Sequence, residues 1–370
     1  MDENLELLEM LLDEACRVHE ITGLAAAVVY RGETLWIRGF GLADTARDVA
    51  VTPDTIFRMG SITKIFTSTM LMQLQQVGRL QLDDPVAKYV PAFQVHSPFP
   101  GTQHVTLRHL ASHTAGIPHM PSLPPFTDPF AVLAADVRGE MIYPTFDQIV
   151  DTEIVLEFPP LSRIQYSNIG LMLLGNVLAC IAGQPYREYV AQHILQPLGM
   201  SRSGFNLSPP VLQEMAVGYM GPSYENLIPG LFNTYPQPAP ITDLGDFAPA
   251  GQLYSTVNDM ARFIAMHIWD GEADEGTHLL SAGTLREMQA PVLFEDDWRS
   301  GRAIGWQLLQ VAGQTVLGHG GADYGYTAYL LIAPAARIGF VCATNDGMKH
   351  QVMETIPLEA MALLLPFDAN

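Results

Sequence analysis

The sequence predicts a mixed α/β (α+β) fold in which helices flank an antiparallel sheet built from both ends of the chain. Strand patterns occur before residue 45 and again after residue 300, and each set adjoins a terminal amphipathic helix pattern. Between about 80 and 250 the chain has short helical patterns, clustered prolines and few strand patterns. We therefore expect an α/β domain from residues 1–80 and 250–370, with residues 81–249 as a helical, loop-rich insertion.

The first 80 residues predict a helix, a strand hairpin and a second helix. Apolar residues recur on one helical face of residues 3–19. Residues 24–30 have the character of a buried strand, and residues 34–40 return after a turn with alternating character. Apolar residues lie on nearly all sides of the helix expected over 61–78. Few of its sides can therefore face solvent, and this helix is predicted to be central.

The remaining helices and strands fall into the same two predicted domains. Short helices are expected over residues 106–113, 146–157, 168–182 and 186–194. After residue 250 the sequence predicts a helix over 255–270, strands over 304–308, 314–318, 326–333 and 337–343, and a closing helix over 353–365. The active site is expected between the two predicted domains.

Composition limits the partners of this protein. The 370 residues are 48% hydrophobic and 16% charged, which is typical of a globular protein with a sizeable core. The formal net charge of −20 argues against nucleic acid and against an anionic membrane, because both select positive patches. The acidic start does not resemble a secretory signal, and the longest apolar run, residues 169–182, is too short to span a bilayer. A cytoplasmic location is the resulting prediction, whereas the oligomeric state is left open.

A serine opens the predicted central helix three residues before a lysine. Residues three apart lie on one helical face, about 5–6 Å apart at Cβ, so Ser61 and Lys64 would be neighbours. A serine in the first turn also has an unpaired amide N–H. A hydroxyl, an amine and a free amide together could begin an acyl-transfer site, although a surface or capping serine would show the same spacing.

Two further stretches carry polar groups or glycines at positions suited to a cleft. Tyr166 and Asn168 lie two residues apart at a junction between a loop and a helix, where both side chains can project into a cleft. His319-Gly320-Gly321-Ala322 lies at the end of a predicted strand. Its glycines would let a substrate approach the strand backbone and bind its N–H groups.

These three motifs, in this order, resemble those of the serine β-lactamase and penicillin-binding-protein superfamily. The closer resemblance is to the branch that contains class C β-lactamases, D,D-carboxypeptidases and family VIII esterases, also called the S12 serine hydrolases. Residues 108–117, 197–200 and 249–263 resemble further stretches of that branch, so the likeness covers nearly the whole chain.

The resemblance implies roles for the motif residues. Ser61 would be the nucleophile, and either Lys64 or Tyr166 would be its general base. The oxyanion would lie between the amides of Ser61 and Ala322, where each donor is typically worth about 3–4 kcal/mol in the transition state. Asn168 would hydrogen-bond Lys64 and the acyl side chain of the substrate.

One motif departs from the β-lactamase pattern. Many β-lactamases carry Lys-Thr-Gly where this chain has His319-Gly320-Gly321, which would line the substrate site. Gly320 provides no hydroxyl, and an unperturbed histidine is only partly charged near pH 7. Efficient β-lactam turnover is therefore not expected. The His-x-Gly form resembles carboxypeptidases, D-aminopeptidases, esterases and the mitochondrial LACTB-like proteins.

The sequence therefore predicts a cofactor-free serine hydrolase that cleaves small carboxylic esters, amides or peptides through an acyl-enzyme on Ser61. The alternatives are a β-lactamase, a non-hydrolytic penicillin-binding-type protein and an acyltransferase. His109 and His113 have the spacing of a helical metal pair, but no glutamate follows His109 as in a zinc protease, so no metal is expected. A lipase-type oxyanion loop at His319 is rejected because the chain has no Gly-x-Ser-x-Gly elbow.

Overall fold

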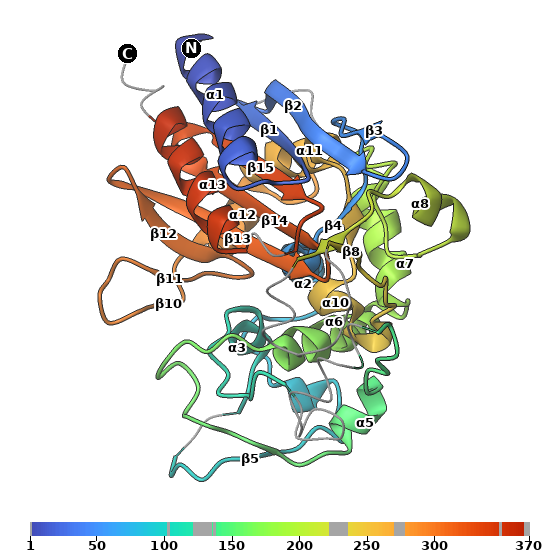
Figure 1. The fold of residues 1–370 in the computed structure, drawn as a ribbon. Coiled ribbons are helices and arrows are strands. Elements are labelled where there is room, and N and C mark those ends of the chain that lie inside the picture. Colours follow the sequence, from blue (N-terminus) through green and yellow to red (C-terminus); the bar gives the residue numbers. More distant parts are fainter. Residues whose placement is uncertain are drawn as a thin grey trace.

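The computed structural model describes residues 2–101, 104–120, 135, 138–221, 236–269, 278–347 and 350–365. Its main sheet contains β1 (Gly23–Tyr30), β2 (Glu33–Asp44), β3 (Val49–Ala50), β10 (Leu293–Phe294), β11 (Gly301–Arg302), β12 (Gln307–Val311), β13 (Gln314–Asp323), β14 (Tyr326–Ala333) and β15 (Ile338–Thr344). The strand order is β10-β11-β12-β13-β14-β15-β1-β2-β3, and every pairing is antiparallel. The predicted sheet from both chain ends is confirmed (Figure 1).

The two ends of the chain meet in the middle of this sheet, where β1 pairs with β15. Leu24 lies opposite Thr344 and Ala26 opposite Cys342. The centre of β1 is a run of three alanines, Ala25 to Ala27, that is completely buried. Small side chains there allow helices to pack closely on both faces of the sheet.

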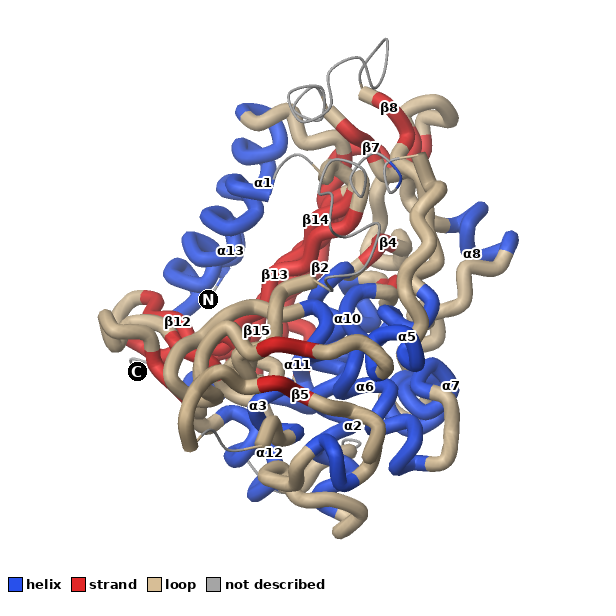
Figure 2. Tube along the Cα trace, turned by 90° about the horizontal axis from the view of Figure 1, so that it is seen from below, coloured by secondary structure: helices blue, strands red, loops and turns tan. Residues whose placement is uncertain are grey.

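Helices cover both faces, as the view from below shows (Figure 2). α1 (Asp2–Val18) and α13 (His350–Leu364) pack on one face and against each other, so that the Asn4 side chain donates to the Leu363 carbonyl at 3.1 Å. α11 (Val257–His267) packs against β1 and β15 on the opposite face. This arrangement agrees with the predicted terminal helices and with the helix expected after residue 250.

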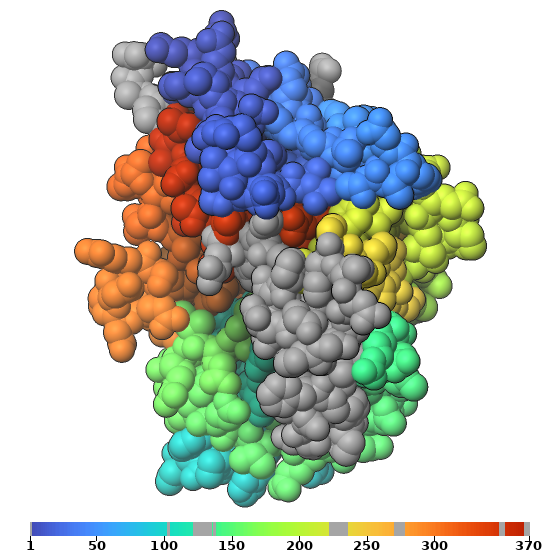
Figure 3. All heavy atoms as spheres, in the orientation of Figure 1, coloured from blue at the N-terminus to red at the C-terminus, as the bar shows by residue number. Residues whose placement is uncertain are grey.

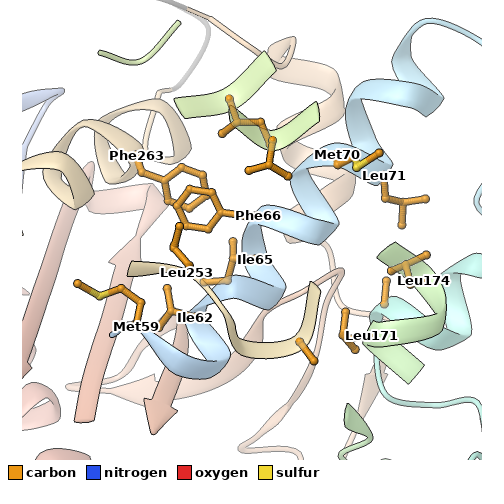
Figure 4. Close-up of a cluster of buried hydrophobic side chains, with 14 of the residues drawn as sticks. Met59, Ile62, Ile65, Phe66, Met70, Leu71, Leu171, Leu174, Leu253 and Phe263 are labelled. Atoms are coloured by element: carbon orange, nitrogen blue, oxygen red, sulfur yellow. The ribbon is translucent and has the colours of Figure 1, made fainter. Parts of the chain in front are cut away.

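The helix that follows Ser61 is central, as predicted. A 3₁₀ turn, η1 (Gly60–Ile62), leads into α2 (Thr63–Gln76), most of whose side chains are buried. Ile62, Ile65 and Phe66 pack toward Leu253 and Phe263 (Figure 4), and the rings of Phe66 and Phe263 stack with centroids 3.8 Å apart. The other end of α2 packs on the helix that begins at Asn168.

The middle of the chain supplies most of the remaining helices. These are α3 (Leu107–Ala111), α5 (Phe146–Val150), α6 (Asn168–Ala182), α7 (Tyr186–Val190) with a π-helical turn at Ala191–Leu195, α8 (Pro209–Glu214) and α10 (Ala248–Gly251). Two-residue strands pair as β4 (Phe57–Arg58) with β9 (Tyr254–Ser255), β5 (Val95–His96) with β6 (Ile154–Val155), and β7 (Tyr219–Met220) with β8 (Gln237–Pro238). In Figure 3 the chain ends occupy the upper half and the cyan and green middle the lower half.

One hydrophobic core runs through both halves. It contains Ala25 and Leu330 of the sheet together with Leu110 of α3 and Leu171 of α6. The division into domains at residues 80 and 250 consequently stays a prediction. No single helix in the described part of the chain is long and apolar enough to cross a bilayer.

Several element boundaries differ from the predicted ones. The strand expected over 304–308 starts only at Gln307, because Gly305 has φ +77° and its backbone turns beside Ser68. The strand expected to end at Gly318 continues to Asp323. The helix expected over 146–157 ends at Val150, and the chain then forms the strand β6, which pairs with β5. The sequence analysis missed β10, β11 and α12 (Ala282–Gln289).

Candidate active site

Two of the predicted site residues contact the hydroxyl of a third. Ser61 Oγ lies 2.9 Å from Lys64 Nζ and 2.6 Å from the Tyr166 hydroxyl, which donates to it. Lys64 Nζ also donates to the Ala250 carbonyl at 2.6 Å. The 3₁₀ turn η1, the helix α2 and the loop before α6 therefore bring an amine and a phenol within hydrogen-bonding distance of one serine hydroxyl.

Glycines allow the fourth component, the strand β13, to approach Ser61. Gly60 has φ +49°, a conformation that side chains disfavour, and a Cβ on it would lie 2.7 Å from the Ala322 nitrogen. A Cβ on Gly321 would lie 2.0 Å from the Met59 carbonyl oxygen. Because both positions lack a side chain, the backbone at Ala322 lies beside the turn that carries Ser61, as the predicted oxyanion site requires.

Lys64 is completely buried, and its environment disfavours the ammonium form. Burial lowers the pKa of Lys64 well below 10.5, and the positive charge of Arg302 lowers it further. A neutral amine at this position can accept the proton of Ser61.

Burial shifts the pKa of Tyr166 in the direction opposite to that of Lys64. Burial raises the pKa of Tyr166 to about 12, although its hydrogen bond to Ser61 and the charge of Arg302 partly oppose this. Its ring stacks on His113 with centroids 4.5 Å apart, and its carbonyl hydrogen-bonds His119 Nδ1 at 3.0 Å. The phenol is therefore held in place and keeps its proton at neutral pH.

The loop before α6 is fixed by hydrogen bonds around Ser167. The Ser167 hydroxyl caps α6 by accepting from the Gly170 N–H at 3.0 Å, and it donates to the Pro118 carbonyl at 2.7 Å. The Ser167 N–H donates to His113 Nδ1 at 3.0 Å, while His109 Nδ1 accepts from the Thr106 N–H at 3.3 Å. One nitrogen of each histidine is thus used in a hydrogen bond with a backbone N–H.

His319 is neutral rather than partly charged. Burial lowers the pKa of His319 to about 3, and the positive charge of Arg302 acts in the same direction. Its Nδ1 lies 2.7 Å from the Gly320 carbonyl, an acceptor, so Nδ1 carries the proton. Nε2 is buried and has no hydrogen-bond partner among the described residues. The partial charge expected from the sequence is wrong because that expectation took no account of burial.

The sequence analysis missed Arg302, the cation that acts on this site. Arg302 lies on β11, and its charge affects the pKa values of Lys64, Tyr166 and His319. Its guanidinium forms no ion pair or hydrogen bond with the residues that the structure describes. A two-residue strand has no periodicity, so only the positive charge near a predicted strand could have drawn attention to it.

A cavity of about 450 Å³ opens beside Ser61. Among the described residues it is lined by Ser61, His119, Met120, Tyr143, Asn168, Leu244, Phe247, Ala250, Gly251, Ala322, Asp323, Tyr324 and Gly347. The Asn168 amide points to Met120 Sδ at 3.8 Å and makes no hydrogen bond to Lys64, contrary to the prediction. Gly320 and Gly321 lie in β13, and neither lines the cavity.

Comparison with known proteins agrees with this arrangement. The family model described as Beta-lactamase matches residues 11–360. The chain belongs to the beta-lactamase family. It is accordingly an enzyme of the serine-hydrolase type that the sequence predicts.

Individual relatives cover most of the chain. It is 30% identical to Penicillin-binding protein 4 of Amycolatopsis lactamdurans, over 89% of this chain and 82% of that protein. It is 27% identical to the D-alanyl-D-alanine-carboxypeptidase/endopeptidase AmpH of Escherichia coli, over 89% of this chain and 81% of that protein. It spans only 64% and 62% of two longer relatives, from Homo sapiens and Dictyostelium discoideum.

A solved structure confirms the fold. The octameric penicillin-binding protein homologue from Pyrococcus abyssi superposes with a TM-score of 0.78 at 28% sequence identity. The match covers 99% of this chain and 78% of that one.

Proposed function

We propose that this protein hydrolyses amide, peptide or ester bonds of small substrates through an acyl-enzyme on Ser61. The observation that carries the proposal is the pair of short contacts at Ser61 Oγ, 2.9 Å to Lys64 Nζ and 2.6 Å to the Tyr166 hydroxyl. A serine hydroxyl is a weak nucleophile unless a base lies within this distance. Membership in the beta-lactamase family supports the same chemistry.

We infer that Lys64 is the general base. Burial lowers the pKa of Lys64 and raises that of Tyr166 to about 12, so the amine loses its proton more readily than the phenol. In acylation the lone pair of Lys64 Nζ takes the Ser61 proton while Oγ bonds to the substrate carbonyl carbon. The resulting oxyanion would accept hydrogen bonds from the N–H groups of Ser61 and Ala322.

Tyr166 would act on the leaving group. When the tetrahedral intermediate collapses, the bond to the leaving nitrogen or oxygen breaks and that atom takes the Tyr166 proton. The Lys64 ammonium then returns a proton to Tyr166, which restores both groups. In deacylation a water molecule gives its proton to Lys64 and attacks the acyl carbon, and Ser61 Oγ leaves with a proton from Lys64.

Two observations support amides and esters above β-lactams. The neutral His319 provides no fixed charge where Lys-Thr-Gly enzymes have their lysine. The similarity to AmpH, a carboxypeptidase and endopeptidase by name, favours a peptide amide. The cavity is lined by Ser61 and Ala322, so it would hold part of the substrate next to the nucleophile.

Covalent labelling tests the proposal. A fluorophosphonate should add once to the protein, and peptide mapping of the intact-mass adduct should place it on Ser61. Ser61→Ala should lose the adduct, whereas Ser201→Ala, at an exposed serine outside the site, should keep it. An adduct that survives Ser61→Ala would contradict the assignment.

Kinetics with p-nitrophenyl acetate separate hydrolysis from the alternatives. Continued turnover after the burst supports hydrolysis, and a stoichiometric burst without turnover would support a non-hydrolytic binder. Turnover that increases with added amine would support an acyltransferase. Nitrocefin turnover near the diffusional limit, about 10⁸ M⁻¹s⁻¹, would reverse the preference for amides and esters over β-lactams.

A further inference from the structure

A buried arginine contacts the strand that carries the second proposed oxyanion donor. Arg58 lies on β4, three residues before Ser61, and its side chain is only 2% exposed. Its Nη2 lies 2.7 Å from Asp323 Oδ2. Asp323 directly follows Ala322 at the end of β13. The ion pair therefore connects the two segments that bear the proposed oxyanion N–H groups.

The backbones of these segments touch where side chains are missing. A Cβ at Gly60 would lie 2.5 Å from the Ala322 carbonyl oxygen, and a Cβ at Gly321 would overlap the Met59 carbonyl. Glycine permits this approach but does not by itself maintain it, because a backbone contact without side chains has no interlocking shape. The Arg58–Asp323 pair spans the same junction and adds an attraction across it.

Both ends of the ion pair are anchored. The backbone on either side of Arg58 is held by pairing with Tyr254 and by the Met59 N–H, which donates to the Leu253 carbonyl at 2.8 Å. Arg58 Nη1 donates to the Thr242 carbonyl at 3.3 Å. Asp323 Oδ1 accepts from the Tyr324 N–H at 2.9 Å. Movement of β13 relative to η1 would therefore stretch the ion pair rather than carry one partner along.

The contact is electrostatic rather than an aligned hydrogen bond. Arg58 Nη2 lies close to the carboxylate, but neither Nη2 nor Nε has an acceptor in hydrogen-bond geometry in the part of the chain that the structure describes. A charge–charge contact of this kind depends on the presence of a cation more than on the planar guanidinium. It also neutralises Asp323, the one charged side chain among the described residues that line the cavity.

We propose that Arg58 and Asp323 are positioning residues that set the separation of the Ser61 and Ala322 N–H groups. The proposal rests on the acyl-enzyme function proposed above. Oxyanion donors must lie about 2.7–3.1 Å from the developing charge, so a small displacement of β13 would weaken one of them in the transition state. Without Arg58, the Asp323 carboxylate would also be an unpaired anion near a developing negative charge.

The test compares substrate turnover with binding of a transition-state analogue. Phenylboronic acid forms a tetrahedral, negatively charged adduct with a serine hydroxyl and so requires both oxyanion donors. Arg58→Met is expected to lower kcat for p-nitrophenyl acetate about 10–100-fold and to raise the Ki of phenylboronic acid by a similar factor. The KM should stay within about twofold, because the ground-state ester carries little charge on its carbonyl oxygen.

Two further variants distinguish positioning from general damage. Arg58→Lys retains the cation and is expected to recover most of the loss. Asp323→Asn keeps the acceptor for the Tyr324 N–H and should fold even if Arg58→Met does not. It is expected to raise the same Ki about 5–50-fold. Arg108→Met, which removes the ion pair with Asp83 outside the cavity, is the matched control and should leave this Ki unchanged.

The outcomes separate this inference from the proposed function. If Ser61→Ala abolishes labelling but Arg58→Met and Asp323→Asn leave the phenylboronic acid Ki unchanged, the positioning role is wrong and the acyl-enzyme stands. An Arg58→Lys variant no better than Arg58→Met would also contradict the proposal. If Ser61→Ala keeps the covalent label, the proposed function fails first, whatever the ion pair does.

Discussion

At the scale of single residues, the charge of Lys64 links stability to activity. Burial lowers its pKa below 10.5, so the folded chain holds fewer protons than the unfolded chain at pH values between the two pKa values. Stability therefore rises with pH across that window and levels off above the unfolded pKa, near 10.5. At neutral pH the buried amine costs stability, and under the proposed function this cost is the consequence of providing a base for Ser61.

Lys64→Met tests this trade-off. The variant should lose activity toward p-nitrophenyl acetate and yet be more stable at pH 7 by roughly 1–2 kcal/mol, since an apolar side chain fills the same space without a desolvation cost. Urea denaturation at pH 7 and pH 9 measures the stability, and p-nitrophenyl acetate hydrolysis measures the activity. The variant should also lose the rise in stability between these pH values, and a less stable Lys64→Met protein would argue against a desolvated amine.

The second prediction for a single residue is that removal of Arg302 shifts the pH profile of kcat/KM. Its positive charge opposes protonation of Lys64, so its removal should raise the pKa of Lys64. In the proposed mechanism activity requires the neutral amine, which is present above that pKa and lost as the pH falls through it. Arg302→Met should therefore move the acid limb of the kcat/KM profile to higher pH. Arg299→Met, on an exposed side chain of the same hairpin, should not move the limb.

At the scale of elements, the approach of β13 to η1 requires glycine. A Cβ at Gly321 would lie 2.0 Å from the Met59 carbonyl oxygen, a backbone atom that cannot rotate away. Gly321→Ala should therefore separate the strand from Ser61, reduce kcat/KM at least 100-fold and destabilise the fold by about 2 kcal/mol. Gly283→Ala, in α12 with only the Ser281 hydroxyl nearby at 3.7 Å, is the control and should stabilise the fold slightly.

Elements with a strong pattern could be predicted from the sequence, and short ones could not. The helix over 168–182 has the predicted bounds, because an apolar run follows a capping serine at Ser167. Two-residue strands such as β11 have no periodicity, so Arg302 could not be placed. The resemblance to a family brought Ser61, Lys64 and Tyr166 together. It did not indicate the neutral state of His319, which depends on burial.

At the scale of the whole molecule, the site depends on a core shared by distant parts of the chain. Ser61 lies in η1, which packs on β13 and β14 and leads into α2. α2 contacts α11 through the stacked rings of Phe66 and Phe263, and it packs on α6, the helix that Tyr166 precedes. The 2.6 Å hydrogen bond between the two residues therefore depends on the packing of α6 against α2. Two independently folding domains would not maintain such a distance without a large apolar interface between them.

This shared core predicts a single cooperative unfolding transition. Leu171→Ala removes a completely buried side chain from α6 and should destabilise the protein by about 2–5 kcal/mol. Because the core is continuous, one calorimetric transition should move to lower temperature, and loss of p-nitrophenyl acetate hydrolysis should coincide with it. Phe263→Ala, in α11 on the far side of α2, should shift the same transition. A protein with separate domains would instead show two transitions, with Leu171→Ala moving one and Phe263→Ala the other.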